Sequence, residues 1–253
     1  MRPDLGRVDE HARGMGAFAA PAVELPGFTA FFPDEGPAWA VPRDPAGEPD
    51  ALDDQISGLR SAFVARDRPL LIELVALAWP ALPAALASRG LAVIEETPLL
   101  VLRPGGPAPR RRHPLGPARA RWVGPGEDLA FVASLMRQGF ELRGGDSPAA
   151  LAEELRAALS GPLRIAVAEL DGLPAGSGCA AALAEVCEIS SVSTLPNQRR
   201  RGVGAALIGF LAGEHFAAGG ELCWACAPDA RAAGLFLDAG FEDGGFRMAM
   251  GEG

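Results

Sequence analysis

The sequence contains no lysine and no tyrosine, and its net charge is −9 at pH 7, with 23 basic and 32 acidic residues. A Walker phosphate loop is excluded because it requires a lysine. The acidic balance argues against a nucleic-acid or anionic-membrane partner, since both need a basic surface. A neutral or cationic substrate suits this chain better.

Long apolar runs are also lacking. No uninterrupted stretch reaches the roughly 18 residues of a membrane span, and the first residues lack the apolar core of a signal peptide. The nearest candidate, residues 69–87, contains Glu73, Pro80 and Pro83, which lipid does not tolerate well. We expect a buried strand, a turn and a short helix there, no membrane partner, and a cytoplasmic protein.

The four cysteines are Cys179, Cys187, Cys223 and Cys226, and the last two form a C-x-x-C pattern. This pattern falls in a predicted strand, where residues three apart point to opposite faces and do not easily share a metal or a disulfide. Zinc would also need a second ligand pair at a suitable spacing. The sequence therefore predicts buried structural thiols and no metal.

At 253 residues, with 49% hydrophobic residues, the chain is long enough for two globular domains. Residues 104–118 are rich in proline, glycine and arginine, as exposed linkers are. We therefore expect an N-terminal domain at 1–103 and a C-terminal domain at 119–253.

Hydrophobic periodicity predicts the elements of both domains and an α/β class with a mixed sheet. In the C-terminal domain we expect helices at 127–138, from Ser147, from near Gly202 and at 230–240, and strands at 163–170, 177–185, 187–195, 221–227 and 246–250. In the N-terminal domain we expect strands at 26–32, 38–42, 69–76 and 91–103, and helices at 51–65 and 81–89. The element order βαβαβ therefore occurs in both halves.

One segment, LPNQRRRGVGAAL at 195–207, has the features of a phosphate-binding site. Arg199, Arg200 and Arg201 precede a predicted helix, at the end where cations are disfavoured. Gly202 and Gly204 allow backbone N–H groups to crowd toward a ligand, so a phosphate would satisfy both features. The Rossmann loop is excluded because its third glycine is missing.

This segment resembles the pyrophosphate-binding motif of the GNAT superfamily of N-acetyltransferases, R/Q-x-x-G-x-G/A, matched by Arg199, Gly202 and Gly204. The strand that leads to Pro196 and the segment LFLDAGF at 235–241 fall in the same order as in that family. The resemblance covers roughly residues 119–253. It implies a GNAT fold and an enzyme that transfers an acetyl group from acetyl-CoA to a primary amine of a small molecule or peptide.

The resemblance also implies residue roles. The backbone of Val192, Ser193 and Thr194 would bind the pantetheine arm, and the Val192 N–H would polarise the thioester carbonyl as a catalytic group. The pyrophosphate would be bound by Arg199, Arg200, Arg201, Gly202, Val203 and Gly204. Asp229 stands where the family often has an asparagine that contacts the cofactor.

Phe236 stands where many relatives have a tyrosine that protonates the leaving thiolate. A thiol has a pKa near 8.5, so its thiolate can leave without a dedicated acid. Cys226 or a bound water are the alternatives for that proton.

Glu188 is the candidate base for the substrate ammonium. The two-residue strand period places Glu188, Ser190, Val192 and Thr194 on one face, and a carboxylate on an otherwise apolar strand needs a purpose or a partner. The equally weighted alternative is a structural ion pair with Arg164. Glu141 near the acceptor pocket and His215 on an exposed helix face are weaker candidates.

The N-terminal domain lacks an arginine–glycine phosphate loop, so we expect a degenerate GNAT-like domain that does not bind CoA and supports the active one. A silent acyl-CoA-binding sensor is the alternative to an enzyme, favoured by the missing tyrosine. A nucleic-acid protein using the arginine clusters is a third reading, disfavoured by the acidic total. The chain is expected to be a monomer or a homodimer.

Overall fold

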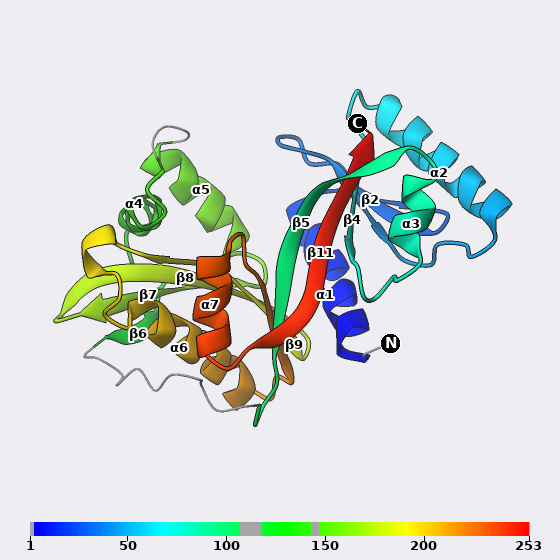
Figure 1. The fold of residues 1–253 in the computed structure, drawn as a ribbon. Coiled ribbons are helices and arrows are strands. Elements are labelled where there is room, and N and C mark those ends of the chain that lie inside the picture. The colour runs from blue at the N-terminus through cyan, green and yellow to red at the C-terminus, as the bar shows by residue number, and fades with distance from the viewer. Residues whose placement is uncertain (1–2, 107–117, 143–146, 253) are drawn as a thin grey trace. The chain divides into compact units, whose positions relative to one another are not determined.

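The computed structural model describes residues 3–106, 118–142 and 147–252 (Figure 1). These residues form an N-terminal unit, residues 3–99 together with 244–252, and a C-terminal unit, residues 100–243. The predicted linker at 104–118 lies mostly outside the described residues. The division differs from the predicted one at its end, because the last strand of the chain belongs to the N-terminal unit.

The N-terminal unit is a sheet with helices packed on it. Its elements are α1 (Pro3–Ala19), β1 (Ala22–Leu25), β2 (Phe28–Phe31), β3 (Trp39–Pro42), α2 (Pro49–Val64), β4 (Leu71–Val75), α3 (Leu82–Ala87), β5 (Leu91–Leu102) and β11 (Glu242–Glu252). The strand order is β1-β2-β3-β4-β11-β5, with β11 antiparallel to β4. The predicted strand and short helix in residues 69–87 are confirmed as β4 and α3.

Two elements of this unit, α1 and β1, were not predicted from the sequence. Helix α1 buries Asp9 and His11 beside Leu5 and Val8, so its inner face is not uniformly apolar and its periodicity is weak. The strand predicted near 26–32 is confirmed as β2, but β1, which pairs with it in a hairpin, was not predicted. The turn between them holds Gly27 at φ +76°. Glycine adopts this left-handed conformation without steric cost.

The C-terminal unit consists of strands with helices packed on both faces. Its elements are β6 (Arg119–Trp122), α4 (Leu129–Gly139), α5 (Pro148–Ala158), β7 (Leu163–Leu170), β8 (Leu173–Leu183), β9 (Val186–Thr194), the 3-10 turn η1 (Pro196–Gln198), α6 (Val203–Ala217), β10 (Leu222–Cys226) and α7 (Ala230–Asp238). The strand order is β5-β10-β9-β8-β7-β6, to which β5 contributes its last residues. The short edge strand β6 was not predicted.

Alternating residues of β7 show how the helices are divided between the two faces. Ile165 and Val167 pack with α4 and α5, whereas Ala166 and Ala168 pack with α6 and α7. Figure 1 shows these helix pairs on opposite sides of the C-terminal sheet. No helix in the described part of the chain is long and apolar enough to cross a membrane.

Candidate functional site

The C-terminal unit contains a cavity of about 560 Å³ where three elements converge. The end of β9 contributes residues 192–194, the start of α6 contributes 202–205, and the start of α7 with its preceding loop contributes 228–232. Gly139 and Phe140, at the end of α4, also line it. Most residues predicted to bind CoA therefore line one cavity.

A bulge in β9 shapes this cavity. Ser193 pairs with Ser177 on β8 but Ser190 pairs with Cys179, so β9 has one more residue than β8 in this interval. Ser191 has φ +52°, a left-handed conformation that absorbs the extra residue. On the other side, the parallel ladder with β10 ends at Glu188 and Trp224, so within the described residues the rest of β9 pairs with no strand there.

The same bulge overturns the predicted face of Val192. Val192 packs with Cys187 and Ile189 in the core under α6, so Glu188 points to the opposite face. The prediction that Glu188 and Val192 share one face is therefore wrong, because the extra residue shifts the two-residue period by one. The proposed roles of the two residues remain predictions.

The start of α6 has backbone N–H groups without a backbone partner within the described residues. Gly202, in its cap position, has φ +85° and no side chain caps the helix. Ala206 is the first residue to donate a helical hydrogen bond, to the Gly202 carbonyl at 2.9 Å. Within the described residues the N–H groups of Val203, Gly204 and Ala205 have no backbone acceptor, and all three residues line the cavity. Unpaired N–H groups and the helix dipole together favour a phosphate here.

Gly204 also brings α6 close to α7. A Cβ at this position would lie 2.9 Å from Leu235 Cδ2, so only glycine fits without a shift of the neighbour. The close approach places the first turn of α6 beside α7.

The three consecutive arginines have three different environments. Arg199 donates to the carbonyls of Thr194 and Gly139 and pairs with Glu141 at 2.6 Å. Arg201 pairs with Asp171 at 2.8 Å and does not line the cavity. Arg200, at φ +63°, lines the cavity and has no side-chain partner among the described residues. Of the three, Arg200 is the one available to a ligand.

Asp229 and Phe236 line the cavity from α7. Asp229 caps α7, because its carboxylate accepts the Ala232 N–H at 2.7 Å. Phe236 is buried and packs edge-on against Phe241 with ring centroids 5.1 Å apart. The ring at 236 therefore contributes shape but no proton. Cys226 does not line the cavity.

Glu188 lies on the α4 face of the sheet and does not line the cavity. Its charge is close enough to Cys179 to help raise the pKa of that thiol to about 12, although burial is the main cause. The alternative that Glu188 pairs with Arg164 is wrong: Arg164 stacks on the Trp122 ring at 3.9 Å. Trp122 packs into the core under α6, on the other face of the sheet.

His215 was predicted on an exposed face, and this is also wrong. It is buried at the end of α6, with its Nε2 3.1 Å from the Glu185 carbonyl. Because this contact joins the end of α6 to the turn between β8 and β9, His215 has a structural role.

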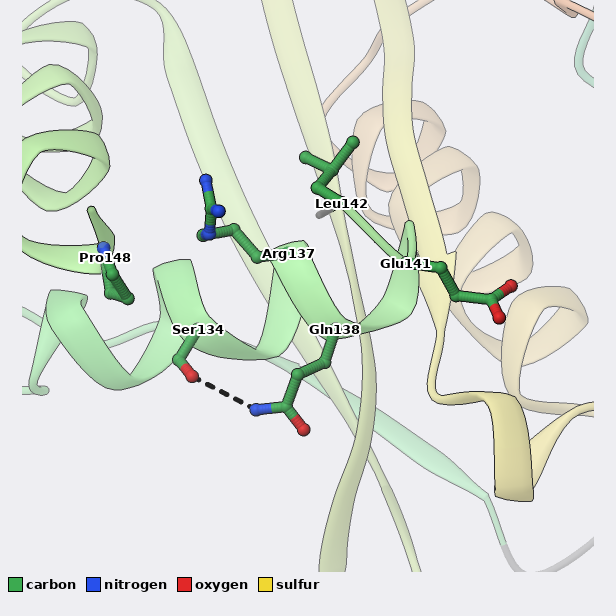
Figure 2. A pocket seen from close by; sticks show the side chains of 6 residues that line it. All are labelled: Ser134, Arg137, Gln138, Glu141, Leu142 and Pro148. Carbon is green, nitrogen blue, oxygen red and sulfur yellow. Dashed lines mark hydrogen bonds between the residues drawn. The ribbon is translucent and has the colours of Figure 1, made fainter. Parts of the chain in front are cut away.

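A smaller cavity of about 340 Å³ lies against α4 and the start of α5. Figure 2 shows its six labelled side chains, with Gln138 donating to Ser134 Oγ at 3.1 Å. The Glu141 carboxylate points away from Arg137 and Pro148 (Figure 2) and engages Arg199 instead. The charged groups of this cavity do not converge on one point, so it provides no catalytic constellation.

The cysteines are free thiols. Cys223 is buried in register with Cys187 on the neighbouring strand, and the Cys187 thiol together with burial raises the pKa of Cys223. Cys226 is less buried than Cys223. Among the described residues, no group of three or more His, Cys, Asp or Glu side chains could hold a metal ion.

A family model described as "Acetyltransferase (GNAT) family" matches residues 130–241, which contain β9, α6 and α7. This segment is a GNAT-family domain. The bulged strand and the unpaired helix start described above belong to this GNAT domain. No curated protein matches the chain at a significant level.

Solved structures extend the likeness over both units. A GCN5-related N-acetyltransferase from Kribbella flavida is 21% identical with a TM-score of 0.76, over 98% of this chain and 95% of its own. One from Sphaerobacter thermophilus is 15% identical with a TM-score of 0.64, over 88% and 76%. A tandem GNAT protein from the clavulanic acid biosynthesis pathway is 14% identical with a TM-score of 0.64, over 88% and 77%. At these identities the likeness shows the fold, and it confirms the predicted mixed α/β class with a GNAT-type architecture.

Sequence reasoning missed two parts of the GNAT domain's cavity. Gly139 ends α4 against Ser193, where a Cβ would lie 2.6 Å from the Ser193 Oγ. Arg231 lines the cavity from the first turn of α7. The signal for Arg231 was present, because a cation at a predicted helix start is the same feature that singled out Arg199 to Arg201.

Proposed function

We propose that this protein is an acetyl-CoA-dependent N-acetyltransferase that acts on a primary amine of a small molecule or peptide. The observation that carries the proposal is the start of α6, where three unpaired N–H groups and the unpaired Arg200 line one cavity. The diphosphate of CoA matches these donors in charge and in hydrogen-bonding capacity. The residues present therefore fit the cofactor.

The separation of β9 from β10 supports a site for the pantetheine arm. Beyond Glu188, the β10-facing edge of β9 carries backbone groups that no strand pairs within the described residues. An extended chain with amide groups can hydrogen-bond to such an edge as an added strand does. Residues 192–194 would supply these contacts, and the acetyl thioester would supply the electrophilic carbonyl.

Val192 is the candidate for polarising that carbonyl. Ser191 and Val192 lie in the bulge and have no register partner on β8. An N–H group held rigidly in a strand stabilises negative charge as it develops on a carbonyl oxygen, without a reorganisation cost. The side chain of Val192 has no part in this role.

Glu188 is the candidate for accepting the proton of the attacking amine. A substrate ammonium has a pKa near 10, so it must lose a proton before it attacks. Glu188 lies outside the cavity lining, and we propose that a water relays the proton to it. The thiolate would take its own proton from water, since Phe236 has none to give.

The alternative is an acyl-CoA sensor without catalysis, and the buried Phe236 ring favours it. Calorimetric titration with acetyl-CoA, followed by thiol release against a panel of amines, separates the two functions. Binding together with thiol release for some amine supports the enzyme. Binding without release from any amine supports the sensor, and absence of binding refutes both.

A cytoplasmic location, a monomeric or homodimeric state and the absence of nucleic-acid or membrane partners are part of the proposal. Size-exclusion chromatography with light scattering tests the oligomeric state directly.

A further inference from the structure

Three arginines make no ion pair, side-chain hydrogen bond or ring contact within residues 3–106, 118–142 and 147–252: Arg119, Arg200 and Arg231. Every other described arginine has an interaction partner, as Arg199 and Arg201 do. Two of the three unpaired arginines, Arg200 and Arg231, line the same cavity. Asp229 and Asp238 also line this cavity, but neither makes an ion pair with Arg200 or Arg231. In a chain of net charge −9, two arginines without an ion-pair partner in one cavity favour an anionic ligand.

Arg231 and Arg200 reach the cavity from different elements. Arg231 is in the first turn of α7, and Leu235 follows one helical turn later on the same face. Leu235 contacts the start of α6 at Gly204. Arg231 therefore lies one turn, roughly 6 Å along α7, from the contact between the two helices. This offset separates it from the N–H groups at the start of α6.

Arg231 makes no ion pair or side-chain hydrogen bond within the described residues. The nearby carboxylate of Asp229 accepts the Ala232 N–H and makes no ion pair with Arg231. A cation in the first turn of a helix is disfavoured by the helix dipole. Arg231 is thus explained by a second anionic group in the cavity, displaced from the one at α6.

CoA carries two phosphate groupings, a 5′-diphosphate and a 3′-phosphate, held apart by one ribose ring. We propose that Arg231 binds the 3′-phosphate, while Arg200 and the start of α6 bind the diphosphate. The inference rests on the proposed function, because it assigns parts of the same ligand. It makes Arg231 the residue by which this protein distinguishes CoA from dephospho-CoA.

The test is calorimetric titration with acetyl-CoA and with acetyl-dephospho-CoA, which lacks only the 3′-phosphate. Four proteins are compared: native, Arg231→Gln, Arg200→Gln and Arg119→Gln. The last is a matched control, since Arg119 is also exposed and unpaired but does not line the cavity. Each substitution removes one positive charge, so general charge effects are shared.

The native protein is expected to bind acetyl-CoA about tenfold more tightly than acetyl-dephospho-CoA, as one charge-assisted contact allows. Arg231→Gln removes this preference by weakening acetyl-CoA alone. Arg200→Gln weakens both ligands by a similar factor, and Arg119→Gln weakens neither. Thermal unfolding of each variant verifies that the fold is retained.

If Arg231→Gln lowers the affinity for both ligands equally, Arg231 binds the diphosphate and the assignment is overturned. Unchanged affinity for both ligands would also overturn the assignment, because Arg231 would then be a solvated surface charge. In both cases the native protein still binds acetyl-CoA, so the proposed function survives. If the native protein binds neither ligand, the proposed function fails as well.

Discussion

In both units a strand is followed by a helix, but the two helix starts differ in charge and in backbone conformation. In the C-terminal unit, β9 leads to α6, whose start has Gly202 in a left-handed conformation and unpaired N–H groups. In the N-terminal unit, β3 leads to α2, which has Glu48 at its cap, Pro49 next and Asp50 in its first turn. Carboxylates there already complement the dipole and repel phosphate.

The loop before α2 is also closed by its own chain. Gln55 Oε1 accepts the Ala46 N–H at 3.0 Å, and the Gln55 side chain fills the space beside Gly27. The corresponding donors before α6 remain open to a ligand. The comparison shows that the same element order can have different charges and backbone conformations at the start of a helix. We therefore expect the two units to differ in ligand binding. That the N-terminal unit does not bind CoA remains a prediction.

Giving α6 the acidic start of α2 should have the largest effect. Gly202→Glu puts a carboxylate beside the unpaired N–H groups and forces a non-glycine residue to φ +85°. We expect acetyl-CoA affinity, measured by calorimetry, to fall at least about 100-fold, on the order of 3 kcal/mol.

The reciprocal variant, Glu48→Gly, is the control and should leave acetyl-CoA affinity unchanged. An unaltered affinity in Gly202→Glu with a retained circular dichroism spectrum would mean that α6 is not the phosphate site.

Removing the candidate base should affect turnover without affecting binding. Glu188→Gln keeps the shape of the side chain but cannot accept a proton, so we expect kcat at pH 7 to fall about 100-fold. Acetyl-CoA affinity should stay the same, because Glu188 does not line the cavity. Thiol-release kinetics measures the first quantity and calorimetry the second.

Ser190→Ala, at a neighbouring position of the same strand, is the matched control and should retain kcat. If Glu188→Gln keeps native kcat across the pH profile, the proton goes directly to water and Glu188 has no role in it.

Substitutions of Arg199 and Arg200 should differ in their effect on the free energy of unfolding. Arg199→Ala removes hydrogen bonds to the carbonyls of Thr194 and Gly139, which join η1 to β9 and α4. We expect the free energy of unfolding in urea to fall by about 2 kcal/mol. Arg200→Gln should change it by less than about 0.5 kcal/mol, since this side chain has no protein partner in the described residues.

The opposite ranking, in which Arg200→Gln is the more destabilising of the two, would contradict these assignments.

The smallest expected effect belongs to the N-terminal unit. Burial raises the pKa of Asp9, and Trp79 and Arg13 lower it only in part. Because the folded state then binds the proton more tightly than the unfolded state, stability falls as the pH rises from about 4 through the folded pKa. Asp9→Asn lacks this fall, so its Tm at pH 7 should exceed the native value by about 2–4 °C.

The gain should disappear below about pH 4, where Asp9 is protonated in both states. Glu10→Gln, an exposed neighbour with the same charge change, should show no such gain. Equal pH dependence of Tm in the native protein and Asp9→Asn, measured by scanning calorimetry, would refute the buried-charge argument.

Local patterns were enough to predict most elements and the segment at the start of α6 that lines the cavity. Ser147 and Pro148 predicted the start of α5, which Ser147 caps by accepting the Ala150 N–H. Hydrophobic periodicity predicted a helix from near Gly202, and α6 begins at Val203. The arginines and glycines of 199–204 predicted a phosphate site. This was possible because the unfavourable placement of cations at a helix start depends on that segment alone.

Tertiary structure alone decided which side chains point into the cavity. The bulge at Ser191 reverses the face of Val192, Arg199 and Arg201 have protein partners, and β11 joins the sheet of the N-terminal unit. Each of these outcomes depends on a partner distant in the sequence or on the register between two strands. Periodicity is a property of one segment, whereas register and ion pairs are set when segments meet, so no single segment contains that information.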